Sequence, residues 1–177
     1  MWFFMYGCYF FSLASFLMLG IVFVQSLTPF YVFKASPMSF LILTSIVYLF
    51  TETLVMFFFV GTGVSVKEYM LEHKITGNFH KRMIALKRVM YPPQLLNILI
   101  LMTAFIFYGA ADTGKMSVWI YRGLLLLGIW HFCYAKLLQH RSFRDNTFII
   151  LEMAGIDLPS SLPCTVSGAG RVREGVH

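Results

Sequence analysis

Residues 48–63 read YLFTETLVMFFFVGTG, an apolar and aromatic run that carries a single carboxylate, Glu52. With the residues before it, this run forms a continuous apolar stretch over residues 40–60, and a bilayer core requires about 20 mostly apolar helical residues. The sequence therefore predicts an all-α, polytopic membrane protein, a four-transmembrane-helix bundle, because further stretches have the same character. They are residues 2–24, 94–111 and 118–138.

The composition of the whole chain agrees with a membrane domain. Of the 177 residues, 58% are hydrophobic and only 12% are charged, and the mean hydropathy is +0.73. Such a chain has apolar residues left over for its outer surface, so we expect one transmembrane four-helix domain over residues 1–153. Residues 154–177 are rich in Gly, Ser and Pro and predict a flexible C-terminal tail.

The basic residues indicate the topology. The other two connections carry one basic residue each, Lys34 and Lys115, whereas the connection between the second and third stretches carries six. By the positive-inside rule this connection is cytoplasmic, and four spans then place both termini on the cytoplasmic side. The basic residues at the end of the fourth stretch, Lys136, Arg141 and Arg144, agree with this orientation. The six residues are Lys67, Lys74, Lys81, Arg82, Lys87 and Arg88.

The basic connection is predicted to form a cytoplasmic helical segment over residues 64–91. Ser65 and Glu68 fit the S-x-x-E capping box, in which a hydroxyl and a carboxylate satisfy free backbone N–H groups at a helix start. Pro92 and Pro93 are expected to stop this helix and to start the third span.

The second half of the segment predicts a basic amphipathic helix. Its apolar residues recur at helical spacing: Phe79, Met83, Leu86 and Met90. Its basic residues occupy other faces and are candidates for binding the membrane surface or an acidic partner: Lys81, Arg82, Lys87 and Arg88. The alternative is that these charges serve only as the topological signal. Nucleic acid is not an expected partner, because no fold or stacking motif for it is present.

Glu52 and His131 are the main polar residues inside the predicted spans. Glu52 lies about 12 Å from the cytoplasmic end of its span at 1.5 Å per residue, and His131 lies at nearly the same depth in the fourth span. A buried carboxylate in lipid has to face the bundle and find a partner. We therefore expect a Glu52–His131 pair with Asn97 nearby, and with Tyr48 and Tyr134 one helical turn away.

This intramembrane polar cluster has two interpretations. The functional one is a proton relay, an ion site, or a metal or haem ligand, for which His131 and Glu52 are the only metal candidates. The structural one is a polar clasp that orients the helices. No CxxC or HExxH motif occurs, and no cofactor is predicted. A b-type haem would require a second axial ligand from a partner, because only one intramembrane His is available.

Three segments carry a resemblance: F-V-G-T-G-V-S-V-K-E (residues 59–68), A-L-K-R-V-M-Y-P (residues 85–92) and A-D-T-G (residues 111–114), the last with the form of a tight turn in a helical hairpin. Together they cover about the middle third of the chain. In these segments the chain resembles small uncharacterised polytopic bacterial membrane proteins. The resemblance implies a location in the bacterial inner membrane and carries neither an activity nor site residues.

The sequence leaves two classes of function. A small bundle with little exposed domain and no catalytic motif is typical of a non-catalytic accessory or anchor subunit, whose partners are the lipid bilayer and other membrane protein subunits. The alternative is a small electron-transfer or proton-coupled membrane protein built around Glu52 and His131. Partners found by copurification would distinguish the first class, and an absorbance spectrum would reveal the haem form of the second.

Overall fold

The computed structural model describes residues 2–28, 30–31, 36–74 and 78–155. Apart from its first two residues, the predicted tail lies outside these ranges. In the described residues the chain forms a bundle of four α-helices, which confirms the predicted fold class. Each is long and apolar enough to cross a membrane, so the chain has the form of an integral multi-pass membrane protein. The helices are α1 (Trp2–Leu27), α2 (Pro37–Glu72), α3 (Phe79–Asp112) and α4 (Val118–Met153).

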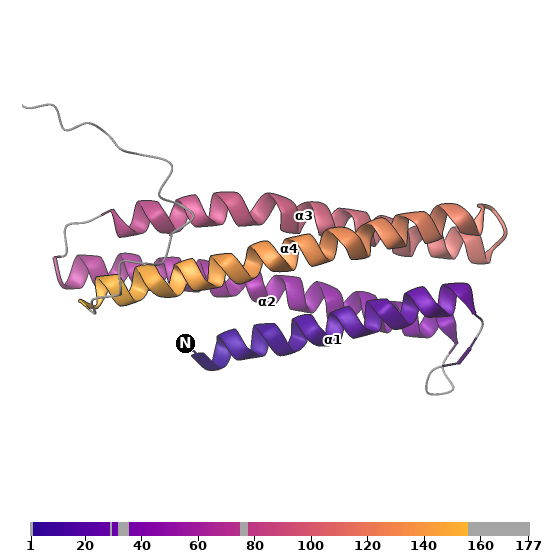
Figure 1. The fold of residues 1–177 in the computed structure, drawn as a ribbon, viewed down its shortest axis with the longest axis horizontal. Helices are drawn as coiled ribbons and strands as arrows, with labels where there is room; N and C mark the ends of the chain where they lie inside the picture. The colour runs from indigo at the N-terminus through magenta and orange to yellow at the C-terminus, as the bar shows by residue number, and fades with distance from the viewer. Residues whose placement is uncertain (1, 29, 32–35, 75–77, 156–177) are drawn as a thin grey trace, which may run out of the picture.

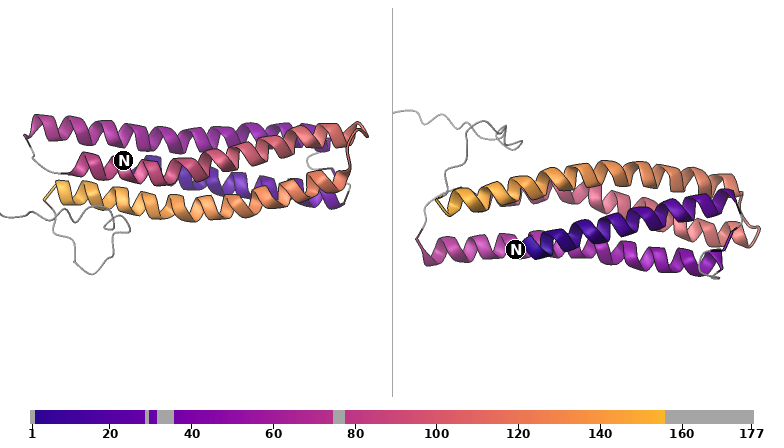
Figure 2. Two further views of the ribbon diagram at one scale, coloured as in Figure 1. Left: turned by 90° about the horizontal axis from the view of Figure 1, so that it is seen from above. Right: turned by 60° about the horizontal axis from the view of Figure 1, so that its bottom comes forward.

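The four helices run alternately up and down and pack in a ring in chain order (Figures 1 and 2). α3 and α4 pack against each other most extensively, and α1 and α4, which close the ring, touch least. Many large apolar side chains face outward, among them Phe57, Ile106 and Trp130. In a soluble protein such a surface would be a liability, but in a bilayer it faces lipid.

The connection between α3 and α4 is the tight turn predicted from the A-D-T-G segment. α3 ends at Asp112, and Gly114 has a φ of 72°, a left-handed conformation that glycine adopts without a steric penalty. The N–H groups of Gly114 and Lys115 donate to the carbonyl oxygens of Ala111 and Ala110, both at 3.0 Å. These two bonds form a Schellman motif, so the turn is satisfied by its own backbone.

Three helices continue well beyond the predicted spans. α2 and α4 have 36 residues each and α3 has 34, which at 1.5 Å per residue gives helices of about 50 Å, against a hydrocarbon core of about 30 Å. α1 has only 26 residues and stops short of the far ends of α2 and α4 (Figure 1). The result is a three-helix extension, which we define as residues 61–72 of α2, 79–93 of α3 and 139–153 of α4. The first residues of α1 pack against its base, where Tyr9 contacts His140 and Phe143.

The extension has a core of its own, and this core explains why the helices continue. Val66, Met83 and Ile149 are buried together, one from each of the three helices. The apolar face predicted for an amphipathic surface helix is therefore turned inward, with Met83, Leu86 and Met90 buried in the bundle. Packing of three helix faces has replaced burial in the headgroup region.

Two predicted boundaries of the cytoplasmic segment are wrong. Ser65 and Glu68 lie inside α2, so they do not cap a new helix start. Pro92 and Pro93 lie inside α3, although proline supplies no N–H for the helical hydrogen bonds. Local signals of this size are overridden where a continuous helix buries a continuous apolar face, because most helical stability in proteins comes from tertiary packing.

The close contact between α3 and α4 can be tested at two glycines of α4. A Cβ at Gly128 would lie 2.5 Å from Cδ2 of the fully buried Leu101, whereas a Cβ at Gly123 would meet nothing within 4 Å. We expect Gly128→Ala to lower the free energy of unfolding by about 1–3 kcal/mol through overpacking. Gly123→Ala is the matched control and should raise stability slightly, because alanine is the better helix former.

Both variants are compared with the unaltered chain by reversible unfolding in one detergent. Equal stability of the two alanine variants would show that α3 and α4 do not approach each other closely at Gly128.

Candidate functional site

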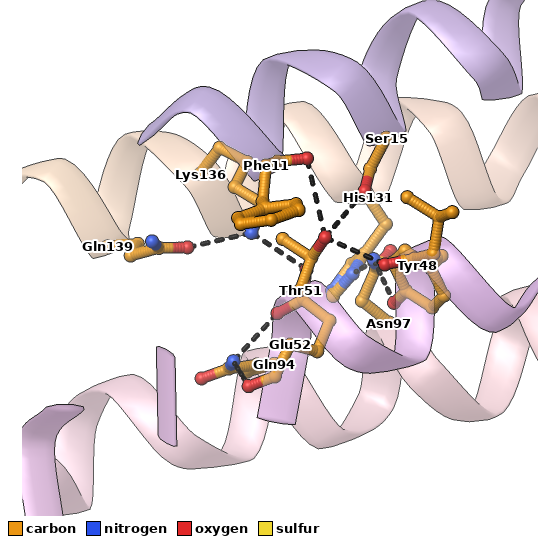
Figure 3. A network of polar contacts seen from close by, with 11 residues as sticks. Phe11, Ser15, Tyr48, Thr51, Glu52, Gln94, Asn97, His131, Lys136 and Gln139 are labelled. Carbon is orange, nitrogen blue, oxygen red and sulfur yellow. Dashed lines mark hydrogen bonds and ion pairs between the residues drawn. The ribbon is translucent and has the colours of Figure 1, made fainter. Parts of the chain in front are cut away.

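Glu52 lies at the centre of a polar layer inside the bundle (Figure 3). Its side chain is 4% exposed, and its Oε1 forms an ion pair with Nζ of Lys136 on α4 at 2.7 Å. Its Oε2 accepts a hydrogen bond from Nε2 of Gln94 on α3 at 2.7 Å, and the same amide donates to the Glu52 backbone carbonyl at 3.1 Å. Lys136 in turn donates to Oε1 of Gln139 at 2.8 Å. This layer joins α2, α3 and α4.

A second polar layer lies one helical turn away from the first. Nδ2 of Asn97 on α3 donates to the hydroxyl of Tyr48 on α2 at 2.8 Å, and Oδ1 of Asn97 lies 3.2 Å from Nδ1 of His131 on α4. Asn97 and Tyr48 are almost completely buried. This layer again joins α2, α3 and α4, and each amide atom of Asn97 has one partner.

The remaining helix, α1, joins the network through hydroxyl groups (Figure 3). Oγ of Ser15 on α1 lies 2.8 Å from Oγ1 of Thr51 on α2, and both residues are fully buried. Thr51 also donates to the backbone carbonyls of Val47 and Phe11, so its single hydroxyl is shared among several acceptors. All four helices therefore meet around residues 48–52 of α2, the segment whose carboxylate stands out in the sequence.

The predicted pair of Glu52 and His131 is wrong. The carboxylate binds Lys136 and Gln94, and the imidazole contacts Asn97. The reason is reach: Lys136 lies five residues further along α4 than His131, and its flexible four-carbon stem brings the ammonium back to the carboxylate. Lys136 is therefore an interior ion-pair partner, where the sequence indicated a flanking topological charge.

The remaining predicted members of the cluster divide. Tyr48 and Asn97 lie in the buried network as expected. Tyr134 does not, because its side chain is 54% exposed and only its ring approaches the His131 ring, at 5.9 Å between centroids. The sequence reasoning missed Gln94, which directly follows the two prolines at an expected span boundary and could have been found as the only amide on α3 one turn from Asn97.

The two candidate metal ligands, Glu52 and His131, are not brought together. Among the residues that the structure describes, no group of three or more His, Cys, Asp or Glu side chains lies close enough to hold a metal ion. His131 uses Nδ1 toward Asn97, so this ring could offer a haem only its other nitrogen. The second axial ligand would still have to come from a partner.

The four basic candidates of the extension occupy different environments. Lys81 and Arg88 are exposed. Arg82 is half-buried and pairs with Glu152 of α4 at 2.6 Å. Lys87 points toward α2, where a Cβ on Gly63 would lie 2.3 Å from its Nζ, and burial lowers the pKa of its ammonium group. Lys81 and Arg88 are thus the members available to a partner or a lipid headgroup.

Comparison with protein-family models, with curated proteins and with solved structures gives no match for this chain.

The Glu52–Lys136 ion pair can be tested by a double-mutant cycle. Removing one partner leaves a buried charge without a counter-ion, which costs about 3–5 kcal/mol, whereas removing both removes the mismatch. Glu52→Leu and Lys136→Leu should each strongly lower the free energy of unfolding in detergent, and the double variant should cost much less than their sum. Glu52→Gln also leaves the Lys136 charge without a counter-ion, but it should cost less than Glu52→Leu because the amide can still hydrogen-bond to Gln94 and Lys136.

The Arg82–Glu152 pair is the control cycle, since its atoms lie about as close but both side chains are partly exposed to solvent. Its coupling should stay below about 1 kcal/mol. A further cycle between Glu52 and His131 should be additive. If the Glu52–Lys136 coupling is no larger than the Arg82–Glu152 coupling, the interior ion pair is refuted.

Proposed function

We propose that this protein is a non-catalytic accessory or anchor subunit of a larger membrane protein complex in the bacterial inner membrane. The observation that carries the proposal is the three-helix extension, a packed unit that stands beyond the bilayer-spanning length and carries a basic outer surface. The exposed basic residues on it and on the adjoining turn are Lys67, Lys74, Lys81, Arg88, Arg141 and Arg144.

The rigidity of the extension supports a docking role. Its three helices share a buried core at Val66, Met83 and Ile149, and the Arg82–Glu152 pair joins α3 to α4 on its surface. A preorganised surface binds without a large loss of conformational freedom, which favours recognition of a partner. The exposed cations outnumber the exposed carboxylates on these segments, which are Glu68, Glu72 and Glu152, and this excess fits an acidic partner protein or an anionic lipid headgroup.

The intramembrane cluster supports the non-catalytic part of the proposal. The carboxylate of Glu52 has a counter-ion and a hydrogen-bond donor, and Asn97 binds a partner with each amide atom. These contacts link different helices, as expected of a polar clasp that fixes helix positions.

The competing proposal is a proton-coupled or electron-transfer protein. One observation favours the proton-coupled form: the ion pair is not sealed on all sides, since Lys136 also lines an open cleft between α1 and α4. Intramembrane ionisable pairs with an access route are typical of proton relays. In that case Glu52→Gln would abolish proton movement in proteoliposomes while leaving assembly with partners intact.

The orientation that follows from the basic extension is testable by cysteine labelling. We place both termini and the extension in the cytoplasm, because Lys and Arg concentrate there. In a chain with Cys133→Ser and Cys164→Ser, a cysteine at Lys74 should react only with probes on the cytoplasmic side, and one at Lys115 only with probes on the other side. Labelling of Lys74→Cys in intact cells by an impermeant maleimide would show that the orientation is the opposite of the one proposed.

The subunit proposal is tested in membranes solubilised as native lipid discs. We expect the unaltered chain to migrate in an assembly heavier than one chain. The triple variant Lys81→Gln, Arg88→Gln and Arg141→Gln should leave that assembly, because exposed charges supply the docking contacts. High salt should have the same effect, since the Debye length falls to about 3 Å at 1 M.

Lys115→Gln at the opposite end of the bundle is the matched control and should remain in the assembly. Migration of the unaltered chain as a single polypeptide in native discs would overturn the proposal.

A further inference from the structure

A cleft of about 250 Å³ opens between α1 and α4, the two ring neighbours that touch least. Leu13 and Phe16 of α1 and Phe132 and Cys133 of α4 line its apolar part. Phe16 and Phe132 stack with their ring centroids 6.2 Å apart. All the lining residues except Gln139 lie within the apolar stretches 2–24 and 118–138, so whatever occupies the cleft comes from the hydrocarbon region of the bilayer.

The polar groups of the cleft are hydrogen-bond donors without enough acceptors. Ser12 is only 9% exposed, and its buried Oγ has no partner among the described residues. Lys136 has three N–H donors, of which Glu52 and Gln139 take two, and its ammonium also lies over the Phe132 ring, 4.9 Å from the centroid. Gln139 receives the Lys136 bond on Oε1, and its amide N–H groups have no partner in the part of the chain that the structure describes. A ligand that carries a hydrogen-bond acceptor would therefore satisfy the donors of the cleft.

The charge balance decides what kind of acceptor fits. Glu52 already neutralises Lys136 at 2.7 Å, so a second anion beside them would be an unpaired charge at membrane depth. Such a charge is costly, whereas a neutral carbonyl satisfies the donors without disturbing the pair. A fatty-acid carboxylate or a phosphate is therefore a poorer match than an ester.

The polarity gradient gives the direction of the occupant. Tyr9 and Gln139 line the end of the cleft at which the three-helix extension begins, and the Tyr9 hydroxyl lies 2.7 Å from Nδ1 of His140. Phe16 and Phe132 line the end nearest the middle of the bundle. A lipid of the leaflet on the extension side would enter with its polar part toward Gln139 and its chain toward the stacked rings.

We propose that this cleft is a binding site for one acyl chain of a membrane glycerolipid, whose ester carbonyl accepts hydrogen bonds from the Ser12 hydroxyl and the Lys136 ammonium. A transmembrane helix of a partner fits less well. The lining from Tyr9 to Phe16 extends only about 10 Å along α1, against the roughly 30 Å over which a spanning helix would pack. The site goes beyond the proposed function and is measured on the isolated chain.

The chain contains a native reporter for this site. Cys133 is exposed and lines the cleft, Cys8 is fully buried, and Cys164→Ser removes the cysteine of the C-terminal region. The purified full-length chain is stripped of lipid in detergent. It is then titrated with diacyl or dialkyl phosphatidylglycerol of the same headgroup and chain length, so that the two lipids differ only in the ester carbonyls.

Native mass spectrometry should show one tightly retained diacyl lipid per chain, and this lipid should slow maleimide labelling of Cys133. The dialkyl lipid should need about tenfold higher concentration for the same protection, the loss expected when buried donors lose their acceptor. Ser12→Ala should narrow the difference between the two lipids. A merely structural role of Ser12 would leave that ratio unchanged.

The variant Leu13→Trp fills the cleft and should abolish protection by either lipid, whereas Leu126→Trp, on an exposed part of α4 outside the cleft, should not. Equal protection by diacyl and dialkyl lipids overturns the carbonyl site, and unprotected Cys133 at every lipid concentration overturns the cleft itself. Tighter binding of a free fatty acid or an isoprenoid quinone would assign the site to another ligand and refute the glycerolipid. These comparisons in the unaltered chain decide the matter even if Leu13→Trp fails to fold.

Discussion

The hydrocarbon interior offers no hydrogen bonds, so every polar group placed there depends on the protein for its partners, and the Glu52–Lys136 ion pair is where this constraint is strongest. The pair fixes the relative depth of α2 and α4, and Gln94 adds α3 to the same layer. Apolar packing between lipid-exposed helices gives little specificity of register, because lipid tails are as apolar as leucine. A buried carboxylate requires its partners at defined positions, so the contacts of Glu52 with Lys136 and Gln94 set how α2, α3 and α4 align along their axes.

The ring of helices is asymmetric, with the most extensive packing between α3 and α4 and the least between its neighbours α1 and α4. α3 and α4 are joined by a short satisfied turn and approach closely at Gly128, and both continue into the extension with α2. α1 is shorter, shares the Ser15–Thr51 contact with α2, and meets α4 mainly through rings and through the bond from Arg122 to the Ser26 carbonyl. The seam between α1 and α4 is therefore the natural place for a cleft.

The sequence was sufficient for the four spans and the hairpin turn, because hydrophobic length and a Gly-containing turn are local properties. It was insufficient for the extension, where the prediction of a surface helix was made from one face of one helix. Met83 and Leu86 have the same pattern whether they face headgroups or pack inside the bundle, where Met83 clusters with Val66 and Ile149 and Leu86 with residues such as Val55. Only the packing of α2 and α4 against α3 distinguishes a helix at the headgroups from a helix inside the bundle, and this packing is a property of the tertiary structure. Likewise, Glu52 was expected to pair with His131 because the two residues lie at the same depth along their helices. That comparison does not include the length of the Lys136 side chain.

The contact of Glu52 with Lys136, in place of His131, changes which groups are available inside the bundle. Both carboxylate oxygens are engaged, Oε1 by the Lys136 ammonium of α4 and Oε2 by the Gln94 amide of α3. Among the described residues, two acceptors take N–H groups of Lys136, and the Ser12 hydroxyl, which lines the same α1–α4 cleft, has no hydrogen-bond partner. A neutral acceptor from the bilayer completes this site without a change in charge. The polar cluster thereby combines contacts that join the helices with the proposed lipid site.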